Sequence, residues 1–407
     1  MLGKTVAVLA LAASCVVIGV QPSLASTENS PWSQTNGNAA QSRVNLTEKV
    51  LTPAAVTKVR PLRSVLAPLR PQNPACGPTG ISAPVLAGGY VYAMTNYKLS
   101  KYNAATGRLV WRTNPDPAFV THYDSLAVSG NLVIVGGDDS CITESEISGS
   151  IFAFNASTGA LVWSANTQPE SGFTGAVVSG SYVVMAGADI GYEVAVFNLS
   201  NGKPVWRHFE CGGNSPDLPL VVGRLVMSYG CDSKGNETIE ADNLATGAAV
   251  WRLTGSWKLQ SGDLNTSNGT HLYVTNPSGT VVDLNPRTGQ VAYSLSQAVN
   301  VLAVGQFRVY ATCGSQGQDI CAYNTSTGAL EWQNTQFGLG PGALAAEAAG
   351  VLYLDSGFAL NAGTGQYITT IWQSPGNSPA TALAVGDGRV AVVSEPRILD
   401  LYGLRGY

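Results

Sequence analysis

Short runs of apolar and β-branched residues, separated by turns that contain Gly or Asn, recur along most of the chain. The stretch from residue 125 to residue 165 shows this pattern in full. A Gly130-Asn131 turn and a Thr158-Gly159 turn divide it, together with one longer loop. The pattern predicts four strands, over residues 125–129, 132–136, 150–155 and 160–165. Strands of this length with such turns predict antiparallel sheet.

A motif recurs near the end of each group of strands: Asn, two variable residues, Thr or Asn, then Gly, with an aromatic residue four positions later in most copies. The motif glycines are Gly107, Gly159, Gly202, Gly247, Gly289, Gly328 and Gly365. Five copies carry tryptophan, namely Trp111, Trp163, Trp206, Trp251 and Trp332. The glycines are 37 to 52 residues apart, which is typical of propeller blades. A truncated eighth copy ends at Gly403.

Each residue type in the motif has a structural interpretation. The Asn side chain can accept hydrogen bonds from nearby backbone amides, and Gly adopts a positive φ without a Cβ clash. The Trp opens the outermost strand, where its large ring can pack between neighbouring sheets. We therefore interpret the repeat as structural docking and not as catalytic machinery.

The segment from Ala153 to Trp163 resembles the tryptophan-docking motif of the quinoprotein (pyrroloquinoline quinone, PQQ) eight-bladed β-propellers, a superfamily that includes BamB-like PQQ-repeat proteins. The leading Ala of the motif is matched at Ala153, Ala241, Ala322 and Ala359 and replaced at Lys101, Val196 and Asp283. The resemblance covers roughly residues 31–407, including a lead-in before the first blade. It implies an all-β fold, an eight-bladed β-propeller of four-stranded antiparallel blades.

The last blade stops after its third strand, so we expect an N-terminal strand within residues 56–65 to close the ring as the missing outer strand. Closure removes an exposed sheet edge. Pro61 fits such a strand because an outermost strand has one unpaired side. The predicted division of the chain is a signal peptide over 1–25, an N-terminal lead-in over 26–50 and the propeller over 51–407.

The first 25 residues have the pattern of a secretory signal. Lys4 precedes a long apolar run, and small residues at Ser23 and Ala25 suit cleavage after Ala25. We therefore expect a secreted or extracytoplasmic protein with no transmembrane segment in the mature chain. Lipid attachment at Cys15 is a disfavoured alternative, because the apolar run continues beyond it.

Six cysteines remain in the mature chain: Cys76, Cys141, Cys211, Cys231, Cys313 and Cys321. An even number in an exported protein suggests disulfides, although six cysteines allow fifteen pairings. If the first strand of each blade is innermost, all six fall on the face that carries the loops between blades and between second and third strands. On that topology we expect the pairs Cys76–Cys141, Cys211–Cys231 and Cys313–Cys321.

The same face carries the long insertions, and we take it as the candidate binding face. Its candidate residues are His122, Tyr123, Asp138, Asp139, Asp189 and Tyr192. Neighbouring carboxylates with loop carbonyls could hold Ca²⁺, but no Asp-x-Asp-x-Asp-Gly loop is present. His122, His208 and His271 show no metal-ligand spacing, and we expect them to satisfy hydrogen bonds.

The charge of the chain and its motifs limit the classes of partner and enzyme that fit it. Charged residues make up only 12% of the chain, the pI is about 5.4 and no Lys/Arg cluster occurs, so we expect no nucleic-acid partner. The resemblance to quinoprotein dehydrogenases would imply adjacent cysteines, a Glu/Asn/Asp calcium set and a catalytic Asp, but no Cys-Cys pair occurs. PQQ and Ca²⁺ are therefore unsupported, and we assign no catalytic, cofactor or metal residues.

We expect a monomeric, non-catalytic binding or scaffolding propeller for an unknown protein or cell-envelope partner. The alternative is a diverged quinoprotein dehydrogenase, or another propeller enzyme, that uses loop carboxylates such as Asp138 and Asp139.

Overall fold

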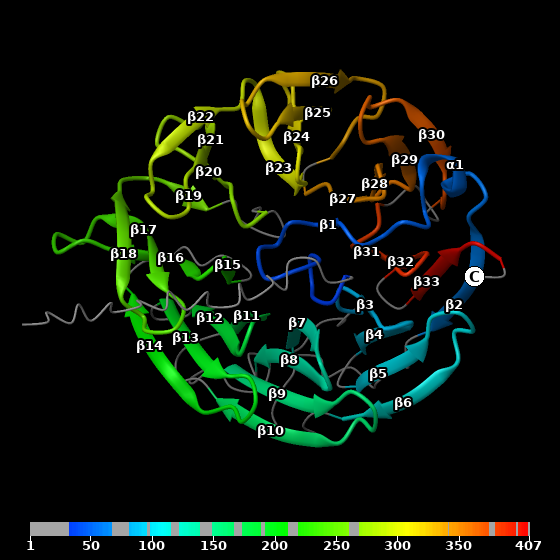
Figure 1. The fold of residues 1–407 in the computed structure, drawn as a ribbon, viewed down its shortest axis with the longest axis horizontal. Coiled ribbons are helices and arrows are strands. Elements are labelled where there is room, and N and C mark those ends of the chain that lie inside the picture. The colour runs from blue at the N-terminus through cyan, green and yellow to red at the C-terminus, as the bar shows by residue number, and fades with distance from the viewer. Residues whose placement is uncertain are drawn as a thin grey trace, which may run out of the picture.

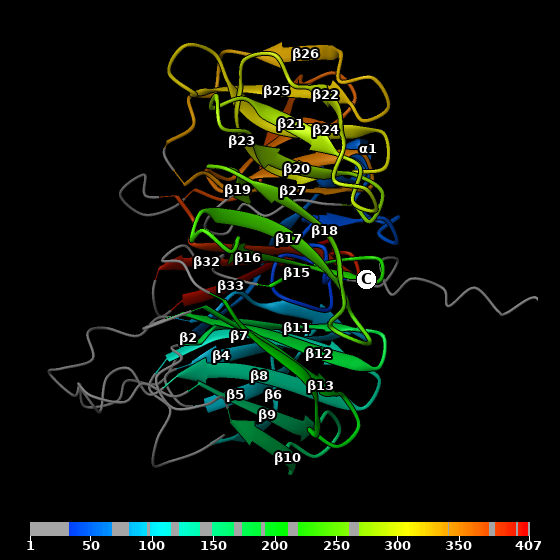
Figure 2. The same cartoon turned by 90° about the vertical axis from the view of Figure 1, so that its left-hand side faces the viewer.

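The computed structural model describes residues 32–66, 81–95, 98–114, 122–138, 149–166, 173–188, 192–210, 219–259, 268–340, 342–373, 379–395 and 398–405. In these ranges the chain forms eight antiparallel blades arranged in a ring (Figure 1). Within a blade the first strand lies nearest the centre of the ring and the last lies at the rim, and Figure 2 shows the ring from its edge. The eight-bladed fold predicted from the repeats is confirmed.

The first four blades follow one another along the chain. Blade 1 comprises β3 (Val85–Ala87), β4 (Tyr90–Thr95), β5 (Lys98–Asn103) and β6 (Leu109–Thr113). Blade 2 comprises β7 (His122–Ser129), β8 (Leu132–Asp138), β9 (Gly149–Asn155) and β10 (Leu161–Asn166). Blade 3 comprises β11 (Phe173–Ser179), β12 (Tyr182–Ala188), β13 (Tyr192–Asn198) and β14 (Pro204–Glu210). Blade 4 comprises β15 (Leu220–Val222), β16 (Leu225–Cys231), β17 (Glu237–Asn243) and β18 (Ala249–Thr254).

The remaining blades complete the ring. Blade 5 comprises β19 (Lys258–Leu259), β20 (Leu272–Thr275), β21 (Val281–Leu284) and β22 (Val291–Ser294). Blade 6 comprises β23 (Ala298–Val304), β24 (Arg308–Cys313), β25 (Asp319–Asn324) and β26 (Leu330–Asn334). Blade 7 comprises β27 (Ala345–Ala348), β28 (Val351–Leu354), β29 (Phe358–Asn361) and β30 (Tyr367–Thr370). Blade 8 comprises β31 (Ala382–Gly386), β32 (Arg389–Glu395), β33 (Ile398–Gly403) and, at the rim, β2 (Arg60–Leu66).

The N-terminal strand β2 closes the ring as predicted. It pairs in antiparallel register with β33, so that Ser64 lies opposite Asp400. The strand begins later than the predicted range, because Pro53–Val56 forms the one-turn helix α1. Thr52 caps this helix through its side chain, and Pro at the first helical position favours a helix start.

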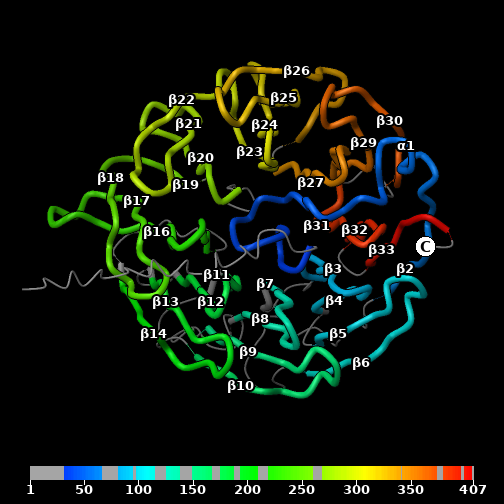
Figure 3. Tube along the Cα trace, in the orientation of Figure 1, coloured from blue at the N-terminus to red at the C-terminus, as the bar shows by residue number. Residues whose placement is uncertain are grey.

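The lead-in does not lie outside the ring. Residues 32–45, which we call the central segment, cross the middle of the ring inside the innermost strands, as the dark-blue tube of Figure 3 shows. Nearly every residue of the segment is buried, and Gln41 is 0% exposed. Its last two residues form β1 (Val44–Asn45), which pairs in parallel with β27 of blade 7.

The central segment bonds to the innermost strands of several blades. Its main chain makes hydrogen bonds to Leu86 in blade 1, Leu126 and Val128 in blade 2, Val221 in blade 4, Val304 in blade 6 and Glu347 in blade 7. The Gln34 amide both donates to the carbonyl of Val178 and accepts from its N–H, at 2.8 and 2.7 Å, in blade 3. The Asn45 amide donates to the carbonyl of Val385 in blade 8 at 2.9 Å. The bonds found in the described part of the chain therefore connect the segment to seven blades.

The motif within the repeats joins most blades to the next. The indole Nε1 of Trp163 donates to the carbonyl of Leu199 in blade 3 at 3.0 Å, and its ring covers Gly202, where an added Cβ would lie only 2.5 Å from the ring. The same bond runs from Trp111 to Ala156, Trp206 to Leu244, Trp251 to Pro286 and Trp332 to Ala362, at 2.7–3.2 Å. The motif glycines all have φ between +64° and +75°. Glycine is needed here for two reasons. It adopts this positive φ without strain, and it has no Cβ that would clash with the ring above it.

Two positions replace tryptophan in this interlock. Tyr293 of blade 5 covers Gly328 and donates its hydroxyl to the carbonyl of Thr325. At the closure, the aliphatic part of the Arg63 side chain from β2 lies over Gly107 of blade 1. The interlock therefore continues from the closing strand into the first blade.

Candidate functional site

The predicted binding-face residues lie at one end of blades 2 and 3. His122 and Tyr123 begin β7, Asp138 ends β8, and His122 pairs with Asp138 in the sheet. Tyr192 begins β13, where it lies opposite Ala188. This is the end at which second strands finish and third strands begin. Two other candidates, Asp139 and Asp189, lie outside the described residues.

The described cysteines lie at the same end of their blades. Cys313 ends β24 of blade 6 and bonds to Cys321 of β25, with a Cα–Cα distance of 5.9 Å. Both cysteines are buried, at 0% and 1% exposure. Cys231, which ends β16 of blade 4, is also disulfide-bonded. The structure thus shows the predicted Cys313–Cys321 disulfide on the face that carries His122 and Asp138.

The other two predicted pairs stay predictions. Cys76, Cys141 and Cys211 lie outside the described residues. Each of the pairs Cys76–Cys141 and Cys211–Cys231 includes at least one of them.

Two of the three histidines lie against buried carboxylates. His208 Nδ1 is 3.6 Å from Asp242 Oδ2 across the boundary between blades 3 and 4, and His271 Nδ1 is 2.7 Å from Asp283 Oδ2 within blade 5. Burial raises the pKa of the Asp242 carboxyl, and neighbouring His208 opposes that rise. These contacts hold packed strands together and give both imidazoles a hydrogen-bonding partner or a nearby charge.

Sequence reasoning missed a carboxyl group in a cavity on the opposite face. A cavity of about 480 Å³ lies between blades 6 and 7, bounded by short turns and by residues 45–53, and Glu347 lines it. Burial raises the pKa of Glu347 to about 7, although the Gly350 N–H and the Arg308 charge favour its ionised form. Glu347 therefore exchanges its proton near neutral pH, a property that its position in β27 did not indicate.

Glu347 makes the protein's stability depend on pH. Its pKa is about 7 when folded and ordinarily 4.5, so the folded chain keeps the proton where the unfolded chain has lost it. The stability from this group is full below pH 4.5 and falls as pH rises through 7. We expect a loss of roughly 2–3 kcal/mol between pH 4.5 and pH 8. Glu347→Gln removes this loss, so the variant should gain that amount over the native protein at pH 8 and nothing at pH 4.

Urea unfolding of both proteins across this pH range checks the prediction, and the difference between them cancels the titration of the histidines. Glu395→Gln, which changes an exposed carboxylate at the end of β32, is the control and should show no such rise with pH. Equal pH profiles for native protein and Glu347→Gln would contradict the assignment.

The carboxylates beside the central segment are committed to backbone N–H groups. Glu48 Oε1 accepts from Val50 and Leu51 at 2.6 and 3.1 Å, and its Oε2 accepts from Gly388 at 2.8 Å. Asp355 accepts from the N–H of Leu344 at 2.9 Å. Burial raises the pKa of the Asp355 carboxyl, and nearby Arg43 opposes that rise.

The oxygens of Glu48 and one oxygen of Asp355 accept backbone hydrogen bonds, so these two carboxylates hold neighbouring backbone segments in place. The sequence has no adjacent cysteine pair. Within the described ranges, no group of three His, Cys, Asp or Glu side chains is arranged to hold a metal ion.

In the described parts of the chain, no helix is long and apolar enough to cross a membrane.

Comparison with known proteins gives matches of two kinds. A family model described as outer membrane protein assembly factor BamB matches residues 32–226, 147–300 and 235–399. A quinone-dependent alcohol dehydrogenase subunit of Gluconacetobacter polyoxogenes is 26% identical over 206 residues, which are 44% of this chain and 24% of that protein. BamB of Bordetella pertussis is 27% identical over 176 residues, 42% of this chain and 41% of that protein. The matches therefore span less than half the length of these curated relatives.

The solved structures agree with the fold. The crystal structure of BamB from Moraxella catarrhalis superposes with a TM-score of 0.58 at 18% identity and covers 86% of this chain and 98% of that chain. At this identity the likeness supports the eight-bladed architecture and leaves the activity to be argued from the residues.

Proposed function

Because this chain belongs to the BamB family of PQQ-repeat β-propellers, we propose that it is an exported, non-catalytic binding or scaffolding protein. Its partner is a protein of the cell envelope, which contacts the face where the second strands end. Residues 1–25 act as the signal peptide in this proposal, and residues 26–50 lead into the ring. The quinone-dependent relatives share the same repeat, so the family alone does not decide between binding and catalysis.

The position of the Cys313–Cys321 disulfide carries this proposal. It fixes the loop between β24 and β25 on the face where His122, Asp138 and Tyr192 also lie. A loop with fixed ends loses less conformational entropy when it binds a partner, so a rigid loop face suits protein recognition. The opposite face has short turns, which the repeated Asn and Gly residues hold in one conformation.

Affinity capture from the native envelope or medium tests the proposal. We expect the native protein to recover a defined partner, and alanine substitutions throughout 113–123 and 137–150 to abolish recovery. The control carries the same type of change on the opposite face, at Lys203, Arg224 and Arg287, and should recover the partner as the native protein does. Unchanged capture by the loop-face variant would show that the proposed face is wrong.

A second candidate function follows from the quinone-dependent relatives. In that case the chain would bind PQQ and Ca²⁺ through loop carboxylates such as Asp138 and Asp139. Titration with PQQ and Ca²⁺, followed by quinone absorbance, distinguishes the two candidates. Saturable one-to-one binding with substrate-dependent dye reduction, abolished by Asp138→Ala or Asp139→Ala, would establish the dehydrogenase. We expect neither binding nor dye reduction.

A further inference from the structure

Lys101 is an unusual residue at a repeated position of the fold. It lies in β5 of blade 1, at the position where other third strands have alanine, as at Ala153, Ala241, Ala322 and Ala359. Lys101 is only 7% exposed. Since four blades of the same chain are built with alanine here, the fold itself does not require a lysine. A buried residue that departs from its own repeat without a structural need points to a function.

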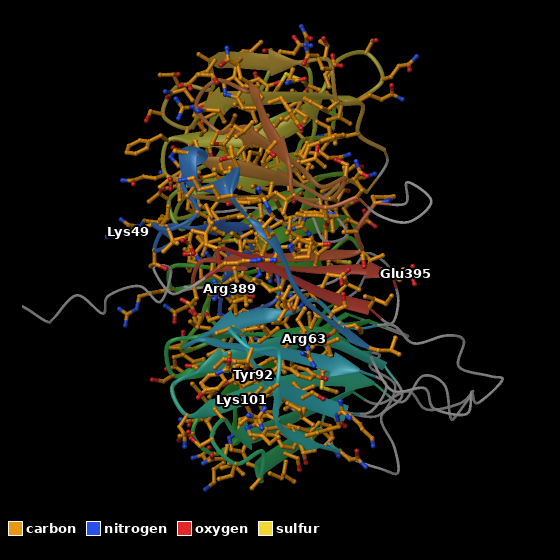
Figure 4. All side chains as sticks on the ribbon, turned by 90° about the vertical axis from the view of Figure 1, so that its right-hand side faces the viewer. Lys49, Arg63, Tyr92, Lys101, Arg389 and Glu395 are labelled. Atoms are coloured by element: carbon orange, nitrogen blue, oxygen red, sulfur yellow. A yellow bond between two sulfur atoms is a disulfide. The ribbon has the colours of Figure 1, made fainter. Side chains whose placement is uncertain are left out.

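The ammonium group of Lys101 lies among neutral partners. Nζ donates to the carbonyl of Ala156 in blade 2 at 2.9 Å and lies 3.7 Å from the centroid of the Tyr90 ring and 5.4 Å from that of Tyr92. Figure 4 shows Lys101 and Tyr92 side by side on blade 1. Burial lowers the pKa of the Lys101 ammonium.

Lys101 differs from the other buried cations in its electrostatic surroundings. Arg43 acts on the carboxylate of Asp355, and Arg389 is influenced by Asp387 and Glu48. No carboxylate of the described residues lies within ion-pair distance of the Lys101 ammonium. The described partners of the ammonium are a carbonyl and two aromatic rings, so an anion that reached Nζ from outside would find no protein carboxylate in competition.

A cavity beside Lys101 provides room for such a counter-charge. It measures about 440 Å³, lies between blades 1 and 2, and is lined by Lys101, Tyr90 and Tyr92. Ser33, Ser129, Asn131 and Ser157 add polar groups to its wall. The side-chain oxygen Oδ1 of Asn131 accepts a hydrogen bond from the hydroxyl of Ser157 at 3.1 Å, which leaves the side-chain nitrogen Nδ2 of Asn131 as a donor. The cavity therefore combines one cation with neutral hydrogen-bond donors.

We propose that this cavity binds a small organic monocarboxylate, with Lys101 as its charged partner. One ammonium group matches the single charge of a carboxylate, and charge-assisted hydrogen bonds from lysine to carboxylate are stronger than those between neutral groups. The aromatic rings of Tyr90 and Tyr92 contribute apolar surface for the carbon skeleton of the ligand. The volume lies within the range of small-molecule sites. The cavity lies beside the turns of blades 1 and 2, away from the proposed partner-binding face.

NMR titration with sodium acetate, sodium benzoate and inorganic phosphate tests the proposal on the mature chain. We expect saturable shifts of the Ala156 and Ser157 amides with a carboxylate, at least about tenfold weaker binding in Lys101→Ala, and no loss in Lys203→Ala, which removes an exposed lysine. Lys101→Met keeps most of the side-chain volume without the charge and should lose binding equally. Without ligand, Lys101→Ala should be at least as stable as the native protein.

Each other outcome overturns the proposal. No saturation of the native protein by either carboxylate up to about 50 mM excludes a useful site. Undiminished binding by Lys101→Met shows that the charge is not its basis, and binding of phosphate alone assigns a different ligand. Failure of both Lys101 variants to fold would show that the lysine serves the fold.

Discussion

A chain that begins at Leu46 will lose most of its stability, although it keeps every strand from β2 to β33. The missing central segment makes its hydrogen bonds inside the ring, to strands that otherwise face its centre. Each such bond contributes about 1 kcal/mol net, and burial of Trp32 adds about 2 kcal/mol. We therefore expect the free energy of unfolding to fall by roughly 5–10 kcal/mol, which is comparable with the whole stability of a typical domain.

Urea and thermal unfolding of chains that begin at residue 32 and at residue 46 measure this effect. A synthetic peptide of residues 32–45, added to the shorter chain, should restore part of the loss, since the contacts need no covalent link. A peptide of the same composition in scrambled order is the control. A loss of less than about 1 kcal/mol on truncation would show that the ring is stable without its central segment.

Gln34 gives a point-mutant version of the same experiment. Its amide bonds to both the N–H and the carbonyl of Val178, as a neighbouring strand would. Gln34→Glu replaces the donor by a second acceptor, which then faces the Val178 carbonyl in a buried site. We expect a cost of about 3 kcal/mol, whereas the same change at exposed Gln290 should cost almost nothing.

The blades could be predicted from sequence because their information is local and repeated. The turn from Asn155 to Gly159 is closed by hydrogen bonds between residues up to four positions apart, and the motif indicates the residues that make them. The closing strand could also be predicted from sequence, because a last blade with three strands needs a fourth. Its start was misplaced because Thr52 and Pro53 initiate a helix where only the strand was considered.

The position of the central segment inside the ring could not be predicted from sequence. Residues 32–45 carry no alternation that marks a strand, and their partners lie far away in the chain, 144 residues away for Gln34. The environment of Lys101 is similar, since its carbonyl partner belongs to the next blade, 55 residues away. The repeat marked Lys101 only as a departure from alanine. Its burial and its cavity emerged from the packing of two blades.

Trp163→Ala will be the most damaging single change in the interlock between blades. Trp163 is 9% exposed, less than the other motif tryptophans, and it both covers Gly202 and donates to the carbonyl of Leu199. Loss of a buried Trp side chain costs about 3–5 kcal/mol through lost apolar burial and the cavity it leaves. The free carbonyl at Leu199 adds to this cost unless water reaches it.

Chemical unfolding of three substitutions separates these contributions. Trp163→Phe keeps a ring without the N–H and should cost about 1–2 kcal/mol. Trp163→Tyr introduces the residue that blade 5 uses as Tyr293, and its hydroxyl should recover part of the loss. We expect stability to fall in the order native, Tyr, Phe, Ala, and equal stability of the Ala and native proteins would show that the ring does not join the blades.

The glycine beneath the ring tests the same contact from the other side. Gly202 and Gly180 lie in blade 3 and both have positive φ, at +68° and +57°, so alanine costs about 1 kcal/mol of backbone strain at either position. Only at Gly202 does the added Cβ meet the Trp163 ring, because nothing lies within 4 Å of such an atom at Gly180. Gly202→Ala should therefore be less stable than Gly180→Ala by about 1–3 kcal/mol. In the Trp163→Ala background that difference should vanish, since the ring that causes the clash is gone.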